Sequence, residues 1–382
     1  MADDTLVAET IAENLTGIVD NATDALSKNG TGDRIPATPE GMVIAYGSLL
    51  IMALLPIYYG SFRSLKFVNE QKESGQKMEN SISRKDAMLF PLIASFALLS
   101  LYVIYKIVPK EYITVLLMSY FFFLGVLALA HIISPYVIKL LPETDYLPNL
   151  PYHLLFHRGE NEERETLVDV QFCTFDIVSV ALCGLVGLLH LYTKHWSTNN
   201  VFGLAFCLNG IEIIHLSSFK TGAMLLGGLF FYDIFWVFKT DVMVTVAKNV
   251  EAPIKLMFPQ DLIENGLAAN NCAMLGLGDI VIPGVFIALL LRFDRSRDTS
   301  KSVYFHVTFV AYVFGLLVTI LVMHVFKHAQ PALLYLVPAC LIAPSMIALV
   351  KGEFPSMLAY DEGDIAAGDD SGASGDAAKK EK

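Results

Sequence analysis

Two aspartates lie inside apolar segments of this chain. Asp233 stands in GGLFFYDIFWVF and Asp279 in AMLGLGDIVIPGVFIALLL. An ionised carboxylate at bilayer depth costs roughly 3 kcal/mol or more, so an acid in a spanning segment is a candidate functional group. Two adjacent carboxyls titrate as a unit and hold one proton, because like charges in contact do not both ionise. One carboxylate then takes a proton from water while the other protonates a scissile carbonyl, which is aspartyl chemistry within a membrane.

The segments that must position these acids are helices in a membrane. The chain is 54% hydrophobic and 17% charged over 382 residues, a balance that excludes an ordinary soluble domain of this length. We therefore predict an all-α polytopic membrane protein with nine transmembrane helices, each long enough to span the roughly 30 Å hydrocarbon core. The nine apolar runs are 41–60, 87–108, 112–134, 172–192, 199–216, 221–238, 273–293, 303–325 and 331–350.

The sixth and seventh runs are antiparallel and place the two acids at matching depths. Asp233 lies five residues from the end of 221–238, and Asp279 lies six residues from the start of 273–293. At a helical rise of ~1.5 Å per residue, both carboxyls lie about 8 to 9 Å inside the same face. Neighbouring helices would thus bring the two acids together.

The residues beside the acids fit such a site. Gly276 and Gly278 precede Asp279 and remove side chains where a substrate backbone or a partner helix must approach closely. Tyr232 precedes Asp233 and offers a phenol near the pair, although successive residues on a helix point in different directions.

The ninth run begins with Gln330-Pro331-Ala332-Leu333 and contains Pro338 and Pro344. Proline supplies no backbone donor, so three prolines leave carbonyls free, and such irregular backbone survives in a membrane only beside protein or a wet cavity. This backbone could pair with an unwound substrate as an added strand. For Pro331 alone, an ordinary helix start with proline in its first turn is an equally good explanation.

The charged residues indicate the orientation in the membrane. Asn14, Asn21 and Asn29 each begin an Asn-x-Thr sequon, which is used only if the N-terminus is luminal. In that orientation the cytosolic segments hold 18 Lys and Arg and the luminal segments 9, as the positive-inside rule expects. We therefore predict a luminal N-terminus and a cytosolic C-terminus.

The two ends of the chain carry most of its net charge of −11. Residues 1–40 hold eight acids and two bases, and residues 361–382 hold seven acids and three bases, so both ends are expected to be solvated and disordered. Neither end predicts nucleic-acid binding. Lys379 and Lys380 stand fourth and third from the end, the arrangement of a dilysine retrieval signal, which predicts residence in the endoplasmic reticulum membrane.

These observations divide the chain into four predicted regions. A luminal disordered glycosylated arm covers 1–40, transmembrane helices one to five cover 41–216, catalytic helices six to nine cover 217–353, and a cytosolic acidic tail with the retrieval signal covers 354–382. The five cysteines have an odd number and scattered spacing, so we expect packed thiols rather than a disulfide framework.

Three motifs together resemble a known family. YD at Tyr232-Asp233, GLGD at 276–279 and QPAL at 330–333, in that order on nine spans, look like the signature of the intramembrane aspartyl proteases, which include presenilin and signal peptide peptidase. The surrounding segments ATPEG at 37–41, FGLAFCLNGIEIIHL, VMVTVAKNVEAPIKLMFPQDL and FKHAQPALLYLVPAC resemble the signal peptide peptidase branch, over nearly all of residues 38–353.

The resemblance implies a hydrolase that cleaves membrane-spanning peptides whose N-terminus faces the cytosol. Its substrates would be remnant signal peptides in the endoplasmic reticulum membrane and some tail-anchored proteins, and no metal or organic cofactor is implied. Membrane lipids are expected partners, whereas degradation machinery and a second copy of the chain are left open.

Two alternatives from other classes remain open. Buried acids and broken helices also build the ion sites of transporters and channels, although we see no internal repeat. A non-catalytic chaperone or degradation scaffold is compatible with the same sequence, and its role would survive Asp279→Ala, which separates it from proteolysis.

Glu212 with His215, and Asp176, are further polar residues in or beside the apolar runs. Glu212 and His215 are three residues apart, but the HExxH pairing is missing, so we expect a hydrogen-bonded interhelical pair rather than a metal site. Asp176, at the start of the fourth run, is expected to be a satisfied polar group at the interface.

Overall fold

The computed structural model describes residues 38–73, 81–140, 150–158, 165–240, 242–250, 252–266, 269, 271–297, 301–326 and 330–362. The predicted glycosylation and retrieval residues Asn14, Asn21, Asn29, Lys379 and Lys380 lie outside these ranges. The chain divides into two compact units, one made of Met1–Ala45 and Pro259–Ala273, the other of Tyr46–Phe258 and Met274–Lys382.

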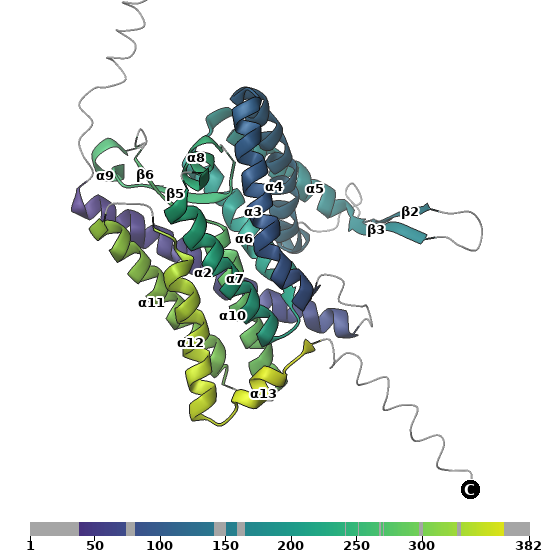
Figure 1. The fold of residues 1–382 in the computed structure, drawn as a ribbon. Coiled ribbons are helices and arrows are strands. Elements are labelled where there is room, and N and C mark those ends of the chain that lie inside the picture. The colour runs from purple at the N-terminus through teal and green to yellow at the C-terminus, as the bar shows by residue number, and fades with distance from the viewer. Residues whose placement is uncertain are drawn as a thin grey trace, which may run out of the picture. The chain divides into compact units, whose positions relative to one another are not determined.

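Helices dominate the described part of the chain (Figure 1). The long ones are α2 (Pro39–Glu73), α3 (Arg84–Ile107), α4 (Lys110–Leu140), α5 (Thr174–Thr193), α6 (Trp196–Ile213), α7 (Phe219–Lys239), α10 (Gly278–Ser296), α11 (Val303–Phe326) and α12 (Leu333–Val350). The short ones are α8 (Val242–Asn249), α9 (Leu262–Asn265) and α13 (Phe354–Ala359).

Within the described ranges, six strands form three two-stranded sheets. β1 (Ser81–Ile82) pairs in parallel with β4 (His215–Leu216). β2 (Pro151–Arg158) and β3 (Glu165–Cys173) form an antiparallel hairpin that extends away from the helices of its unit (Figure 1). β5 (Lys255–Pro259) pairs with β6 (Cys272–Gly276).

Seven of the described helices are long and apolar enough to cross a membrane, namely α2, α3, α4, α5, α7, α11 and α12. The remaining two long helices, α6 and α10, coincide with the fifth and seventh predicted spans but do not belong to this set of seven. α10 has four charged residues, and α6 has three asparagines and a glutamate. The all-α membrane fold is confirmed, while the count of nine spans stays a prediction.

The polar residues of α6 have internal partners. The Asn200 side chain donates to the Met257 carbonyl at 2.6 Å and accepts from the Met257 N–H at 2.8 Å. Asn199 donates to the Lys255 carbonyl at 2.8 Å. These amides bond to the β5 backbone as a neighbouring strand would, which satisfies buried polar groups that the bilayer could not satisfy.

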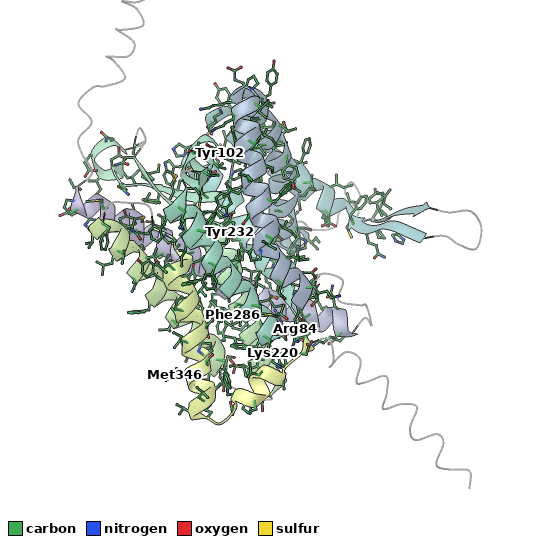
Figure 2. All side chains as sticks on the ribbon, viewed as in Figure 1. Arg84, Tyr102, Lys220, Tyr232, Phe286 and Met346 are labelled. Atoms are coloured by element: carbon green, nitrogen blue, oxygen red, sulfur yellow. The ribbon has the colours of Figure 1, made fainter. Side chains whose placement is uncertain are left out.

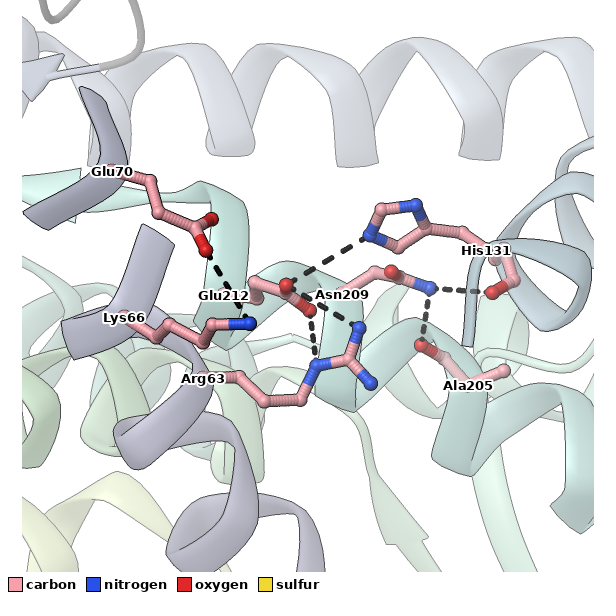
Figure 3. A network of polar contacts seen from close by, with 8 residues as sticks. Arg63, Lys66, Glu70, His131, Ala205, Asn209 and Glu212 are labelled. Carbon is pink, nitrogen blue, oxygen red and sulfur yellow. Dashed lines mark hydrogen bonds and ion pairs between the residues drawn. The ribbon is translucent and has the colours of Figure 1, made fainter. Parts of the chain in front are cut away.

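Glu212 forms a second internal contact near the end of α6 (Figure 3). Arg63 Nε on α2 lies 2.7 Å from one oxygen of Glu212, and His131 Nε2 on α4 lies 3.8 Å from the other. The expected pairing of Glu212 with His215 on one helical face is wrong, because α6 ends at Ile213 and His215 belongs to β4. Asp176 is satisfied as expected, since it accepts from the Cys173 N–H at 2.7 Å and from the Ser134 hydroxyl.

α10 lies at the centre of the larger unit. It packs against α6, α7, α11 and α12, and almost every residue from Ile280 to Asp294 is buried. From Ile280 to Leu291 the helix is apolar on all sides, and such a segment belongs in a buried position. Close packing depends on small residues, because a methyl group on Gly284 would lie 2.6 Å from an Ile211 side-chain atom and one on Gly222 would lie 2.7 Å from the Phe286 ring.

The chain after α12 folds back onto this core. Arg292 on α10 donates from Nε to Glu362 at 2.7 Å and from its Nη1 to the Ser64 hydroxyl at 2.8 Å. The Glu362 N–H donates to the Ser217 carbonyl at 2.9 Å. Glu362 is only 1% exposed, so the expectation that the tail is solvated from residue 361 onward is wrong at this residue. An ion pair with Arg292 outweighs its tendency to stay in water.

The smaller unit ties the start of α2 to the loop around α9. The Thr38 N–H donates to Glu264 at 3.1 Å, and the Thr38 hydroxyl also donates to this carboxylate. The hydroxyl contact holds the pKa of Glu264 below its ordinary value. Gly41 allows close approach here, because a Cβ at this position would lie 2.3 Å from the Gln260 carbonyl oxygen.

Candidate active site

Asp233 on α7 caps the N-terminus of α12. The Leu333 N–H donates to Asp233 Oδ2 at 3.0 Å, and both side chains are buried. The first N–H groups of a helix have no partner within it, and the cap residue Ala332 supplies no side-chain bond. The acid on α7 therefore satisfies a donor that α12 leaves free, at a helix end that favours negative charge.

Asp279 lies at the N-terminus of α10 rather than inside it. The helix begins at Gly278, because residues 272–276 form β6 and the Leu277 N–H donates to the Ile254 carbonyl at 3.1 Å. The expectation that Asp279 lies six residues into a helix beginning at residue 273 is therefore wrong. Backbone pairing with β5 competes successfully with helix formation up to Gly276. Like Asp233, Asp279 thus stands beside a helix N-terminus.

Two neighbours hold the Asp279 residue from different sides. A Cβ on Gly276 would lie 3.3 Å from Asp279 Oδ2, closer than most real contacts, so the glycine leaves room for this carboxyl. The Tyr312 hydroxyl on α11 donates to the Asp279 carbonyl at 3.2 Å. Gly278, in contrast, has no described atom within 4 Å of a Cβ built on it. Within this chain its lack of a side chain serves no packing contact.

The two acids stand on helices that contact each other. α7, α10 and α12 pack against one another, and Leu333, which bonds to Asp233, directly follows Ala332, which lines the same cavity as Asp279. A cavity of about 100 Å³ opens at Asp279. Its lining comes from α2, β6, α10, α11 and the segment before α12, and includes Tyr46, Leu49, Met274, Gly276, Asp279, Thr319, Gln330 and Ala332.

The structure thus brings together most of the residues singled out from the sequence. Asp233 and Leu333 are bonded, Gly276 is beside Asp279, and Gln330 and Ala332 line the same cavity as Asp279. Pro331 is buried, and its carbonyl accepts from the Leu334 N–H at 3.3 Å as α12 begins. The QPAL segment is therefore the approach to a capped helix start.

Tyr232 faces another way. Its ring lies 6.4 Å from that of Trp236, one turn along α7, and the Trp236 indole donates to Ser95 on α3 at 3.1 Å. Figure 2 marks Tyr232 on α7. Among the hydrogen bonds of the described residues, none joins the Tyr232 hydroxyl to Asp233 or Asp279. Its expected place beside the pair is thus not supported by a direct contact.

Tyr312 is not among the site residues predicted from the sequence. This residue lies in a long apolar helix with no polar motif around it, and it reaches Asp279 from 33 positions away. Its side chain is fully buried. A buried tyrosine needs a hydrogen-bond partner for its hydroxyl. The residue type therefore indicates that a partner exists, but it does not identify Asp279 as that partner.

Among the described residues, no group of three or more His, Cys, Asp or Glu side chains is placed to hold a metal ion. The five cysteines, all within the described ranges, are free thiols, and Cys183, Cys207 and Cys340 are buried. The site itself offers two carboxyls, a backbone N–H and a cavity.

Fold and site together define a polytopic membrane protein with two acids beside the N-termini of packed helices. Comparison with known proteins gives its family. A family model described as signal peptide peptidase matches residues 73–364. Signal peptide peptidase of Mus musculus is 57% identical over 334 residues, which cover 87% of each chain, and that of Homo sapiens is 56% identical over 329 residues, 86% of each. Intramembrane protease 2 of Caenorhabditis elegans is 36% identical over 81% of this chain and 89% of its own.

The chain belongs to the signal peptide peptidase family of intramembrane proteases. It is accordingly a multi-pass membrane hydrolase, and its substrates are transmembrane peptides.

Proposed function

We propose that the chain is an aspartic-type endopeptidase in which Asp233 and Asp279 are the catalytic pair, called the dyad below. The observation that carries the proposal is that each acid lies at a helix N-terminus. Asp233 bonds to the Leu333 N–H at the start of α12, and Asp279 lines a cavity whose wall includes Ala332, the residue before Leu333. A carboxylate of the pair removes a proton from water as the oxygen attacks the peptide carbon. The other carboxyl gives its proton to the carbonyl oxygen, and collapse of the tetrahedral intermediate then breaks the C–N bond as the nitrogen is protonated.

The other predicted site residues support this chemistry. Gln330 and Ala332 line the same cavity as Met274, which is exposed on β6, so an unwound substrate has extended backbone available on the cavity's border. Such backbone pairs with a peptide by strand addition. In this proposal residues 217–353 carry the reaction, and helices within 41–216 support them.

The dyad is tested with the purified full-length chain and a peptide that spans the bilayer. Asp233→Ala and Asp279→Ala should each abolish cleavage, because each carboxyl performs a different proton transfer. Asp294→Asn is the matched control, since Asp294 is also a buried acid on α10 but accepts from the Phe305 N–H at 2.9 Å, far along the helix from the site. Full activity of either alanine variant, with unchanged unfolding temperature, would falsify the dyad.

We further propose that the protein resides in the endoplasmic reticulum with its N-terminus luminal and its C-terminus cytosolic. The sequons at Asn14, Asn21 and Asn29, the 18 to 9 distribution of Lys and Arg, and the lysines 379 and 380 support this orientation. The substrates are then remnant signal peptides whose N-terminus is cytosolic, and tail-anchored proteins are a second class.

Glycan removal tests the orientation. An endoglycosidase should increase the mobility of the chain, and replacing all three asparagines by Gln should abolish the shift. A protease added to intact microsomes should leave the arm uncut. Loss of the arm together with an absent glycan shift means that the topology is inverted, and the substrate orientation is then wrong as well.

A further inference from the structure

The backbone at Asp279 lacks a hydrogen bond that an α-helix normally supplies. In a helix, the carbonyl of each residue accepts from the N–H four positions later. Four positions after Asp279 is Pro283, which has no N–H. The carbonyl of a proposed catalytic residue is therefore left without its regular donor, within a buried part of α10.

Tyr312 supplies a donor to this carbonyl. Its hydroxyl lies 3.2 Å from the Asp279 oxygen, and its side chain is 0% exposed. Water therefore does not compete for the hydroxyl from outside the protein. A buried carbonyl requires a partner, and this tyrosine from the neighbouring helix takes the place of the missing N–H.

We propose that Tyr312 is a positioning residue for Asp279, which replaces the helix donor that Pro283 removes. The proposal rests on the catalytic role of Asp279 proposed above. A proline at this position frees the first turn of α10 from one intrahelical bond, and the tyrosine then fixes the same turn from outside. The orientation of the Asp279 side chain depends on α11 as a result.

α11 also contacts the helix that carries the other half of the site. One turn after Tyr312, Gly315 faces α12, where a Cβ on it would lie 3.3 Å from both the Leu336 backbone and the Ala339 side chain. Leu336 is one turn from Leu333, whose N–H binds Asp233. α11 thus packs against α10 near Asp279 and against α12 near its capped end, so that its position bears on both acids.

The test is a double-mutant cycle in the full-length chain. Tyr312→Phe removes the hydroxyl, and Pro283→Ala restores an N–H four residues after Asp279. In the natural background, Tyr312→Phe should lower kcat about two- to tenfold, the range expected for one hydrogen bond, with KM changed less than about twofold. In the Pro283→Ala background the same change should lower kcat less than about twofold, because the backbone then supplies the donor.

A peptide with a tetrahedral hydroxyl group in place of the scissile carbonyl gives a second measurement. Its affinity should fall by the same factor as kcat in Tyr312→Phe, because such a group binds the positioned acids, whereas a loss of general stability would not act selectively on it. The matched control is Tyr304→Phe, which removes a buried hydroxyl of α11 that donates to Glu353 at 2.6 Å, and which should leave kcat unchanged.

Each outcome decides the proposal. Wild-type kcat in Tyr312→Phe overturns it, and so does an equal loss in both backgrounds. If Tyr312→Phe folds only together with Pro283→Ala, the result supports the proposal that the Tyr312 hydroxyl substitutes for the helix N–H. Failure to fold in both backgrounds overturns the proposal. Asp279→Asn distinguishes failure of the proposed function from failure of the positioning role. An active Asp279→Asn variant overturns the proposed function itself. An inactive Asp279→Asn together with wild-type kcat in Tyr312→Phe overturns only the positioning role of Tyr312.

Discussion

Asp233 and Leu333 are 100 residues apart in sequence and are joined by a hydrogen bond of 3.0 Å between a carboxylate oxygen and a backbone N–H. The acid is thereby part of a helix cap as well as of the proposed dyad. A cap of this kind fixes the carboxyl in place, since the donor belongs to rigid backbone rather than to a long side chain.

This fixed position makes the site sensitive to the length of the acid. Asp233→Glu keeps a carboxyl but moves it by one methylene, so it cannot both cap α12 and face Asp279 as before. We expect kcat to fall about 100-fold, the effect of a misplacement of about 1 Å. Cleavage of a spanning peptide by the purified protein measures this. A Glu variant within about threefold of the natural enzyme would show that the cap does not position the acid.

The two glycines of GLGD should respond differently to alanine. A methyl group on Gly276 must push against Asp279 Oδ2 at 3.3 Å, whereas one on Gly278 meets no described atom within 4 Å. We expect Gly276→Ala to lower kcat about tenfold or more, by displacing the carboxyl. Gly278→Ala should affect KM instead of kcat, if substrate backbone fills the open space beside it. Kinetics that are the same for both variants contradict this division.

The Arg292–Glu362 pair should matter mainly when one partner is removed. Both side chains are almost fully buried, so Glu362→Ala leaves an uncompensated charge, and we expect a loss of about 3 kcal/mol or more in the free energy of unfolding. The apolar double variant Arg292→Met with Glu362→Leu should recover most of that loss. Thermal unfolding in one detergent measures all forms. Equal destabilisation of the single and double variants would indicate that the contact surface, rather than the charge, holds the tail.

The buried side chain of His215 should make the free energy of unfolding fall at acidic pH. Its buried ring, beside Phe67, has a pKa lowered to about 3, first by burial and then by the charge of Arg292, while Glu212 opposes the shift. The unfolded chain takes up a proton below about pH 6.5, but the folded chain does not until about pH 3, so stability is lost as pH falls through this window.

The loss at His215 should reach about 2 kcal/mol at pH 5. His215→Phe keeps an aromatic ring but removes the titration. The unfolding temperature of this variant should therefore fall less between about pH 7.5 and about pH 5 than that of the natural chain. The same fall in both proteins assigns the acid sensitivity to other groups.

Substrate cleavage should depend on helix stability. A helix protects its peptide carbonyls, so the acids can attack only where the spanning peptide unwinds. Gly in the apolar segment lowers the unwinding energy by about 1 kcal/mol and Pro by ~3 kcal/mol relative to Ala. Replacing such residues by Leu should slow cleavage, whereas polar changes outside the membrane should have little effect. Equal rates in the same liposomes for both segments mean that unwinding is not limiting.

The sequence predicted the helices well because the bilayer requires long apolar runs. It singled out Asp233 and Asp279 because a carboxylate within such a run is unusual, and their catalytic role stays a prediction. The start of α10 could not be predicted, since AMLG is apolar enough for a helix and becomes β6 only through pairing with β5. Tyr312 and Glu362 could not be assigned for a related reason. Their partners are far away in sequence, and nothing local distinguishes a tyrosine in an apolar helix or an acid in a charged tail.

α10 is attached near both of its ends. Near its start, the Asp279 carbonyl accepts from Tyr312, and near its end, Arg292 donates to Ser64 and Glu362. Arg292 follows Asp279 by thirteen positions, a helical rise of roughly 20 Å. A buried rod held in this way cannot slide along its own axis. The proposed catalytic acid therefore keeps a constant depth in the bilayer, and every substrate would be cut in the same plane. The length of each released fragment would then report how far that substrate had entered the membrane.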